Sequence, residues 1–167
     1  MSFYITIFWM LVTVHMVISD MNQTWSLAPR APMVWLFVLT TMIVGLFGFN
    51  DRSSLVAKVR SWVSTVLSNL LLLVLSLGVL RYNAMHTELI KTVHSPDKQY
   101  TINFYLTNGG AMTSLGVLGE LDGPLWFYKK VFYDYRMDRA EVEWINNHTV
   151  SINGHLLDLG KGETFRD

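Results

Sequence analysis

The sequence contains no cysteine, and its basic and acidic residues balance at 13 each. Without cysteine there can be no disulfide, no thiolate metal ligand and no cysteine nucleophile. Without an excess of positive charge there is no strongly basic face for the phosphate backbone of a nucleic acid. The sequence therefore predicts a fold held together by packing alone, with no nucleic acid among its partners.

Long apolar runs, by contrast, dominate the first half of the chain. They cover about residues 3–19, 33–49 and 62–80, and the composition becomes polar after Arg81. A hydrocarbon core about 30 Å thick is crossed by ~20 helical residues, and all three runs are close to that length. We therefore predict a three-helix transmembrane region over residues 1–82.

The short loops set the expected orientation. The loop between the second and third runs contains three basic residues, Arg52, Lys58 and Arg60. The loop between the first and second runs contains one basic residue, Arg30, and one acidic residue, Asp20. Basic loops stay in the cytoplasm. We expect a cytoplasmic N-terminus and an extracytoplasmic C-terminal region. A cleaved signal peptide is the alternative for the first run, but the run lacks a basic leader and a small-x-small cleavage site.

The C-terminal half has the pattern of a small β domain. Residues 83–94 are expected to extend the third helix or act as a linker, and Pro96 would end any helix there. Residues 95–167 follow as a β-rich domain. Hydrophobic residues alternate with polar ones from Tyr100 to Leu106, and Asn108-Gly109-Gly110 indicates a tight hairpin. The fold class we expect is membrane α plus small all-β: three transmembrane helices, then an antiparallel meander of five or six strands.

Aromatic residues concentrate between Leu125 and Tyr135. Alternation along this strand favours one buried face, with Tyr128 and Lys130 on a wet face. Aromatic side chains supply much of the energy at protein contacts. Trp126, Tyr128 and Lys130 are therefore the candidate partner contacts, although a core role is the ordinary reading for most of these rings.

Two polar side chains within the apolar runs are candidate intramembrane contacts. They are His15 in the first run and Asn69 in the third. Polar groups inside a bilayer mark function in some proteins. In most they bond a neighbouring helix and serve packing, which is the reading we favour here.

Catalytic and metal-binding signals are weak. The densest cluster of charge comprises Asp134, Asp138, Glu141 and Glu143, with Arg136 and Arg139 among them. Paired carboxylates can act as general acid and base. The alternating signs favour a solvated, salt-bridged strand edge instead. The histidines have no metal-ligand spacing. The sequence predicts no catalytic residue, no metal site and no cofactor.

Three stretches resemble a known family. They are SPDKQYTINFYLTNGG from Ser95, AEVEWI from Ala140 and VSINGH from Val150. Over about residues 95–159 the chain resembles a family of uncharacterised small membrane proteins of bacillus-like Gram-positive bacteria, known as a domain of unknown function. The resemblance implies a bacterial cytoplasmic membrane and an exported domain. It implies no reaction, ligand or catalytic residue.

Three functions are compatible with these features. The first is a non-enzymatic, membrane-anchored binding or accessory subunit of an envelope complex, whose partners are membrane lipid and another membrane or envelope protein. The second is an immunity or superinfection-exclusion protein, which fold-level association alone suggests. The third is an envelope enzyme using the acidic cluster. We favour the first, because catalytic spacing is absent and the exported domain is rich in aromatics and turns.

Overall fold

The computed structural model describes residues 2–47, 54–108 and 114–167. The chain divides into two compact units. A helical unit comprises Met1–Ile18 and Ala28–Tyr82, and a β unit comprises Ser19–Leu27 and Asn83–Asp167. Gly48, Phe49 and Arg52, which entered the predictions for the second run and its loop, lie outside the described residues. So do Gly109 and Gly110 of the predicted hairpin.

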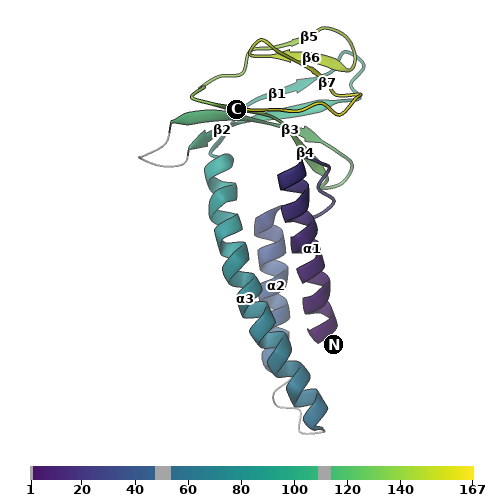
Figure 1. Cartoon of the computed structure of the whole chain (residues 1–167), viewed down its shortest axis with the longest axis vertical. Coiled ribbons are helices and arrows are strands. Elements are labelled where there is room, and N and C mark those ends of the chain that lie inside the picture. Colours follow the sequence, from purple (N-terminus) through teal and green to yellow (C-terminus); the bar gives the residue numbers. More distant parts are fainter. Residues whose placement is uncertain (1, 48–53, 109–113) are drawn as a thin grey trace. The chain divides into compact units, whose positions relative to one another are not determined.

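The helical unit contains the three expected helices: α1 (Ser2–Asn22), α2 (Ala31–Phe47) and α3 (Leu55–Met85), drawn as coiled ribbons in Figure 1. Two of them, α1 with 21 residues and α3 with 31, are long and apolar enough to cross a membrane. The 17 residues of α2 make a helix about 26 Å long at 1.5 Å per residue, shorter than a hydrocarbon core.

A seam of hydroxyl side chains joins α1 to α3. The Thr6 hydroxyl lies 2.9 Å from that of Ser64 and 3.1 Å from that of Ser68, and both serines are fully buried. Small side chains let helix backbones approach closely, and their hydroxyls satisfy one another. Beside this seam, Val34 and Val38 of α2 pack against Leu71 and Leu75 of α3.

The β unit has two sheets rather than one meander. Four strands form consecutive antiparallel pairs: β1 (Glu88–His94), β2 (Thr101–Asn108), β3 (Leu115–Asp122) and β4 (Tyr128–Tyr135). A second sheet contains β5 (Val142–Trp144), β6 (Thr149–Ile152) and β7 (His155–Asp158), also antiparallel. The last strand, β8 (Phe165–Arg166), returns to the first sheet beside β4. Figure 1 shows the second sheet as a separate layer of yellow-green strands.

The two sheets share one apolar core. Phe104 and Phe132 of the first sheet and Ile152 of the second are almost completely buried. They belong to a single cluster that also includes Ile102, Val117, Leu121, Val131, Val150, Leu157 and Leu159. A two-layer arrangement gives each sheet one buried face, which is what the alternating sequence pattern requires.

Three predictions about the β unit are wrong in detail. The helix ends at Met85, and Glu88–His94 forms strand β1 instead of a helical extension, because it pairs with β2 across a bulge near Leu89. β8 pairs parallel to β4, which is possible because the whole second sheet lies between them in sequence. Finally, strict alternation fails in β4, where the neighbouring residues Val131 and Phe132 are both buried.

Candidate interaction surfaces

The loop after α1 is an integral part of the β unit. Gln23 has a left-handed backbone, with φ of 52°, and the Thr24 N–H donates to the Ser19 carbonyl at 3.0 Å. This is the bond by which a Schellman motif closes a helix, here with Gln where Gly is usual. The chain then turns away from the helix axis, and the Ser19–Leu27 segment continues onto β4.

Several polar contacts join the Ser19–Leu27 segment to the rest of the β unit. Ser26 and Tyr128 exchange backbone hydrogen bonds of 2.9 and 3.4 Å. The Lys130 ammonium lies 2.6 Å from the Asp20 carboxylate, both partly exposed. The Trp126 indole donates to the Leu27 carbonyl at 3.0 Å. The Thr164 hydroxyl donates to the Gln23 side-chain oxygen.

The structure thus brings together the three residues that the sequence marked as partner contacts. All three bond to the Ser19–Leu27 segment of this chain, while the Trp126 side chain remains 49% exposed. Sequence reasoning missed the segment that meets them. Its signal was the alternation of Thr24 and Ser26 with Trp25 and Leu27, a period-two pattern typical of a strand.

A second surface is the outer face of the three-stranded sheet. The core-facing residues Val150, Ile152 and Leu157 are buried. The strand register places Glu143, Ser151 and Leu156 side by side on the opposite face. The cross-strand partners Thr149 and Asp158 lie next to them on that face. Leu156 is 64% exposed and Ile145, just beyond β5, is 58% exposed. Outward-facing aliphatic side chains at such positions gain nothing from the protein's own core.

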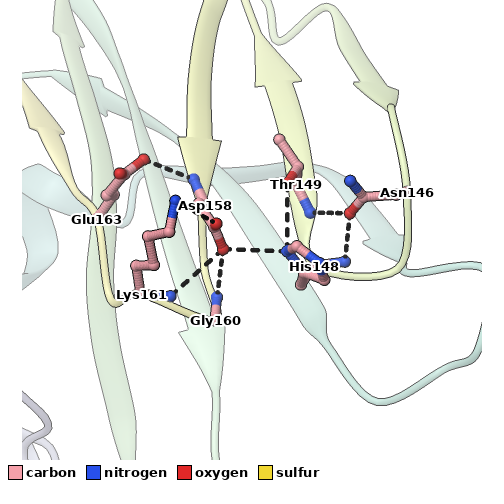
Figure 2. Close-up of polar contacts among 7 residues, drawn as sticks. All are labelled: Asn146, His148, Thr149, Asp158, Gly160, Lys161 and Glu163. Carbon is pink, nitrogen blue, oxygen red and sulfur yellow. Dashed lines mark hydrogen bonds and ion pairs between the residues drawn. The ribbon is translucent and has the colours of Figure 1, made fainter.

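Asp158 is the centre of a polar network at one end of this outer face (Figure 2). Its Oδ1 accepts from the Gly160 N–H at 3.0 Å and the Lys161 N–H at 3.3 Å, and lies 3.0 Å from His148 Nδ1. The Lys161 ammonium is 3.3 Å from Oδ2. The Glu163 carboxylate accepts from the Asp158 N–H at 2.8 Å. The network closes the turn between β7 and β8.

These contacts shift the acidity of Asp158. Burial alone would raise the pKa of its carboxyl, but the hydrogen bonds from Lys161 and His148 outweigh it and hold the pKa below the usual range. In the turn between β1 and β2, hydrogen bonds from the Ser95 hydroxyl and the Gln99 N–H likewise lower the pKa of Asp97. Both carboxylates stabilise tight turns.

Two charged side chains are buried in the β unit. The Lys129 ammonium donates to the Gly162 carbonyl at 2.7 Å, and burial lowers its pKa. Glu120 is 1% exposed and its Oε1 lies 2.8 Å from His86 Nε2, whose ring also meets that of Tyr105 edge-on. Each buried charge has a polar partner, as burial requires.

In the acidic cluster of the sequence analysis, Asp138, Glu141 and Glu143 are exposed and Asp134 is half-buried. Arg139 Nε and Glu141 Oε1 lie 3.7 Å apart on side chains more than three quarters exposed. Such a pair gains little energy in water. In the parts of the chain that the structure describes, no group of three or more His, Asp or Glu side chains is placed to hold a metal ion.

The two candidate intramembrane residues occupy different environments. His15 is half-buried in α1. Asn69 is on the exposed side of α3, where its amide donates to the Thr65 carbonyl one turn earlier at 3.0 Å. Thr6, Ser64 and Ser68 make polar contacts between α1 and α3, and the Trp35 indole of α2 donates to the Ser76 hydroxyl of α3 at 3.1 Å. The sequence analysis had singled out none of these residues, because serine and threonine are common in the apolar runs.

Comparison with protein families identifies the chain's relatives. The sequence profile of DUF5412, a family of unknown function, matches residues 58–166, which is more than half of the chain. The chain belongs to this family. The DUF5412 match covers Trp126, Tyr128, Lys130 and the Asp158 network, but not the Ser19–Leu27 segment. Comparisons with curated proteins and with solved structures found no significant match.

Proposed function

We propose that this protein is a non-enzymatic, membrane-anchored binding or accessory subunit in the cytoplasmic membrane of a bacterium. Its N-terminus is cytoplasmic and its β unit is extracytoplasmic. One observation carries the anchoring: α1 and α3 direct large apolar side chains outward, among them Leu11 at 61% exposure, Leu70 at 60% and Leu73 at 66%. Helices with such surfaces require an apolar solvent.

Insertion of α3 is favourable by a wide margin. Each leucine or valine at a central position contributes about −0.3 to −0.6 kcal/mol on the insertion scale. The leucine-rich stretch from Leu67 to Leu80 therefore supplies several kcal/mol, while the Asn69 amide is satisfied within the helix. In this proposal α2 is a third, short span. Its deficit of a few Å is accommodated by local thinning of the bilayer.

The proposed contact surface for a protein partner is the outer face of the three-stranded sheet. Leu156 and Ile145 are exposed there among the polar side chains Glu143, Thr149 and Ser151. An aliphatic centre within a polar surround is the usual anatomy of a protein interface. The nearby polar side chains Asp158 and His148 stabilise the turn between β7 and β8. A structural role for these groups supports binding better than catalysis at this face.

Site-specific photocrosslinking in native membranes tests this proposal. A photoreactive phenylalanine analogue would replace Leu156, Ile145 or, as a matched control, Leu89, which is an exposed strand leucine of the other sheet. We expect one discrete adduct from positions 156 and 145 and none from position 89. Equal crosslinking from all three positions, or none from the first two, would contradict the proposed surface.

A further inference from the structure

Four apolar side chains gather on a surface separate from the proposed partner face. Trp25 and Leu27 flank Ser26, whose own side is buried at 3% exposure, so the two neighbours point the other way. Leu125 and Trp126 form the turn between β3 and β4. Trp126 is joined to Leu27 by the indole hydrogen bond, and Trp25 packs closely over Gly123 of the same turn. We call Trp25, Leu27, Leu125 and Trp126 the tryptophan patch.

Leu125 is the most unusual member of the tryptophan patch. It is 82% exposed at the tip of the turn and has a left-handed backbone, with φ of 61°. Neighbouring bonds fix this geometry: the Gly123 N–H donates to the Phe127 carbonyl at 2.9 Å, and the Phe127 N–H to the Pro124 carbonyl at 3.1 Å. Glycine or asparagine suits such a position, and leucine is costly there. Because the Leu125 side chain buries little surface within the protein, we expect a contact outside the chain to offset this backbone cost.

Chain length limits how far the tryptophan patch can be from the ends of the helices. Trp25 is three residues beyond the end of α1 at Asn22, and Leu27 is four residues before the start of α2 at Ala31. Fully extended, such connections reach about 10 and 14 Å. The polar interface on each side of a bilayer is about 5–8 Å thick. If α1 spans the membrane, the patch is confined to the region near that interface.

The chemistry of the patch fits the same location. Tryptophan is enriched where hydrocarbon meets headgroups, and apolar side chains there insert about 5–10 Å. None of its four side chains is charged, and Lys130 of the adjoining strand is neutralised by Asp20. We propose that the tryptophan patch binds the lipid interface of the membrane that holds α1 and α3, with Leu125 and Trp126 inserted at the boundary between headgroups and acyl chains. This inference rests on the membrane anchoring proposed above.

Single-cysteine labelling tests the inference in the full-length protein. The chain has no cysteine, so Leu125→Cys introduces one thiol for an environment-sensitive fluorophore. Each labelled variant would be reconstituted in phosphatidylcholine nanodiscs and exposed to a lipid quencher, 5-doxyl phosphatidylcholine, or to aqueous iodide. Leu27→Cys is a second probe of the patch should Leu125→Cys fold poorly. Leu156→Cys is the control on the partner face, and Leu70→Cys reports on α3.

We expect the probes at positions 125 and 27 to be quenched by the doxyl lipid and protected from iodide, and the probe at 156 to show the reverse. Because the patch is neutral, adding phosphatidylglycerol should leave the quenching unchanged. Iodide quenching at 125 with protection at 70 would overturn this inference and leave the anchoring intact. Protection at 125 from both quenchers would overturn the lipid inference, because it would show that another protein or a second copy of this chain covers the tryptophan patch. Iodide quenching at 70 would overturn both proposals.

Discussion

The helical unit and the β unit differ most in the side chains that they expose. In the helical unit Thr6, Ser64 and Ser68 are inside, and leucines such as Leu70 face outward. In the β unit Phe104 and Phe132 are inside, and charged side chains such as those of Arg139 and Glu141 face outward. A fold places outside whatever its solvent accepts. The contrast is what we expect if, as proposed, one chain folds against two solvents.

The contrast also predicts which substitutions lower the stability of each unit. In the β unit, removing an apolar group from the core should cost the most, because water drives its burial. In the helical unit the same change on the outer surface should cost little, and enlarging a small buried residue should cost more. The predictions below test this difference in order of expected size.

The largest effect is expected for Phe104→Ala in the β unit. The ring is fully buried, so its removal costs the transfer free energy of the ring plus that of a cavity, about 3–5 kcal/mol. Leu70→Ala on the outer side of α3 should cost less than about 1 kcal/mol, because lipid or detergent solvates both states. Denaturation in micelles, followed by near-ultraviolet circular dichroism, compares them. Equal losses of stability in the two variants would contradict the proposed difference between the units.

The second prediction concerns the hydroxyl seam. Ser64→Leu should destabilise the helical unit by about 1–3 kcal/mol, because the larger side chain forces α3 away from Thr6. Asn69→Leu, on the exposed side of the same helix, is the control and should leave stability within about 0.5 kcal/mol. Titration of the micellar protein with sodium dodecyl sulfate measures both. A tolerated Ser64→Leu would show that the seam is not tightly packed.

Leu125→Gly should make the β unit more stable. Glycine relieves the left-handed strain of leucine, and after its own entropy cost the net gain is about 0.5–1 kcal/mol. The same variant should associate less well with lipid at the tryptophan patch. Thermal unfolding in micelles checks the first effect. A loss of stability would mean that the Leu125 side chain contributes packing within the β unit.

The fourth prediction concerns the contact between the Ser19–Leu27 segment and β4. A double-mutant cycle with Asp20→Ala and Lys130→Ala should give a coupling energy of about 0.5–1 kcal/mol, since the pair is partly exposed. Unfolding of the two single variants and the double variant gives the value. A coupling of zero would imply that the ion pair adds nothing to the hydrogen bonds between Ser26 and Tyr128.

The smallest effect is a pH dependence from Asp158. Its pKa in the folded protein lies below the unfolded value of about 3.9, so its carboxylate stabilises the fold above that pH. The contribution is lost as the pH falls through the lower, folded pKa. The stability difference between the parent and Asp158→Asn should thus be constant near neutral pH and shrink below about pH 4. A difference that grows in acid would have the wrong sign.

The sequence predicted the parts of the fold that depend on local pattern. The three helices follow from their apolar runs, and β2 follows from the alternation between Tyr100 and Leu106. The third apolar run covers residues 62–80, whereas α3 extends from Leu55 to Met85. The run starts later than the helix because the first turns of α3 contain Lys58 and Arg60. Residues 88–94 looked polar enough for a helical extension, yet pairing with β2 decides their conformation.

Contacts between distant residues could not be predicted. Trp126 meets Leu27 and Lys130 meets Asp20 across about a hundred residues of chain, and no local pattern links them. Parity also failed in β4, where a register shift opposite Gly119 and Glu120 lets Val131 and Phe132 both be buried. Trp126, Tyr128 and Lys130 were predicted as contacts for a partner protein, and in the structure each of them bonds to this chain's own Ser19–Leu27 segment.

The measurement that tests the two-solvent account most directly is thiol labelling of intact bacterial cells with a membrane-impermeant maleimide. Three single-cysteine variants would be compared: Leu156→Cys in β7, Leu70→Cys in α3 and Leu55→Cys at the start of α3. The account predicts labelling at 156 in intact cells, at 55 only after lysis, and at 70 only after denaturation. Labelling at 70 as fast as at 156 in the native protein would contradict it.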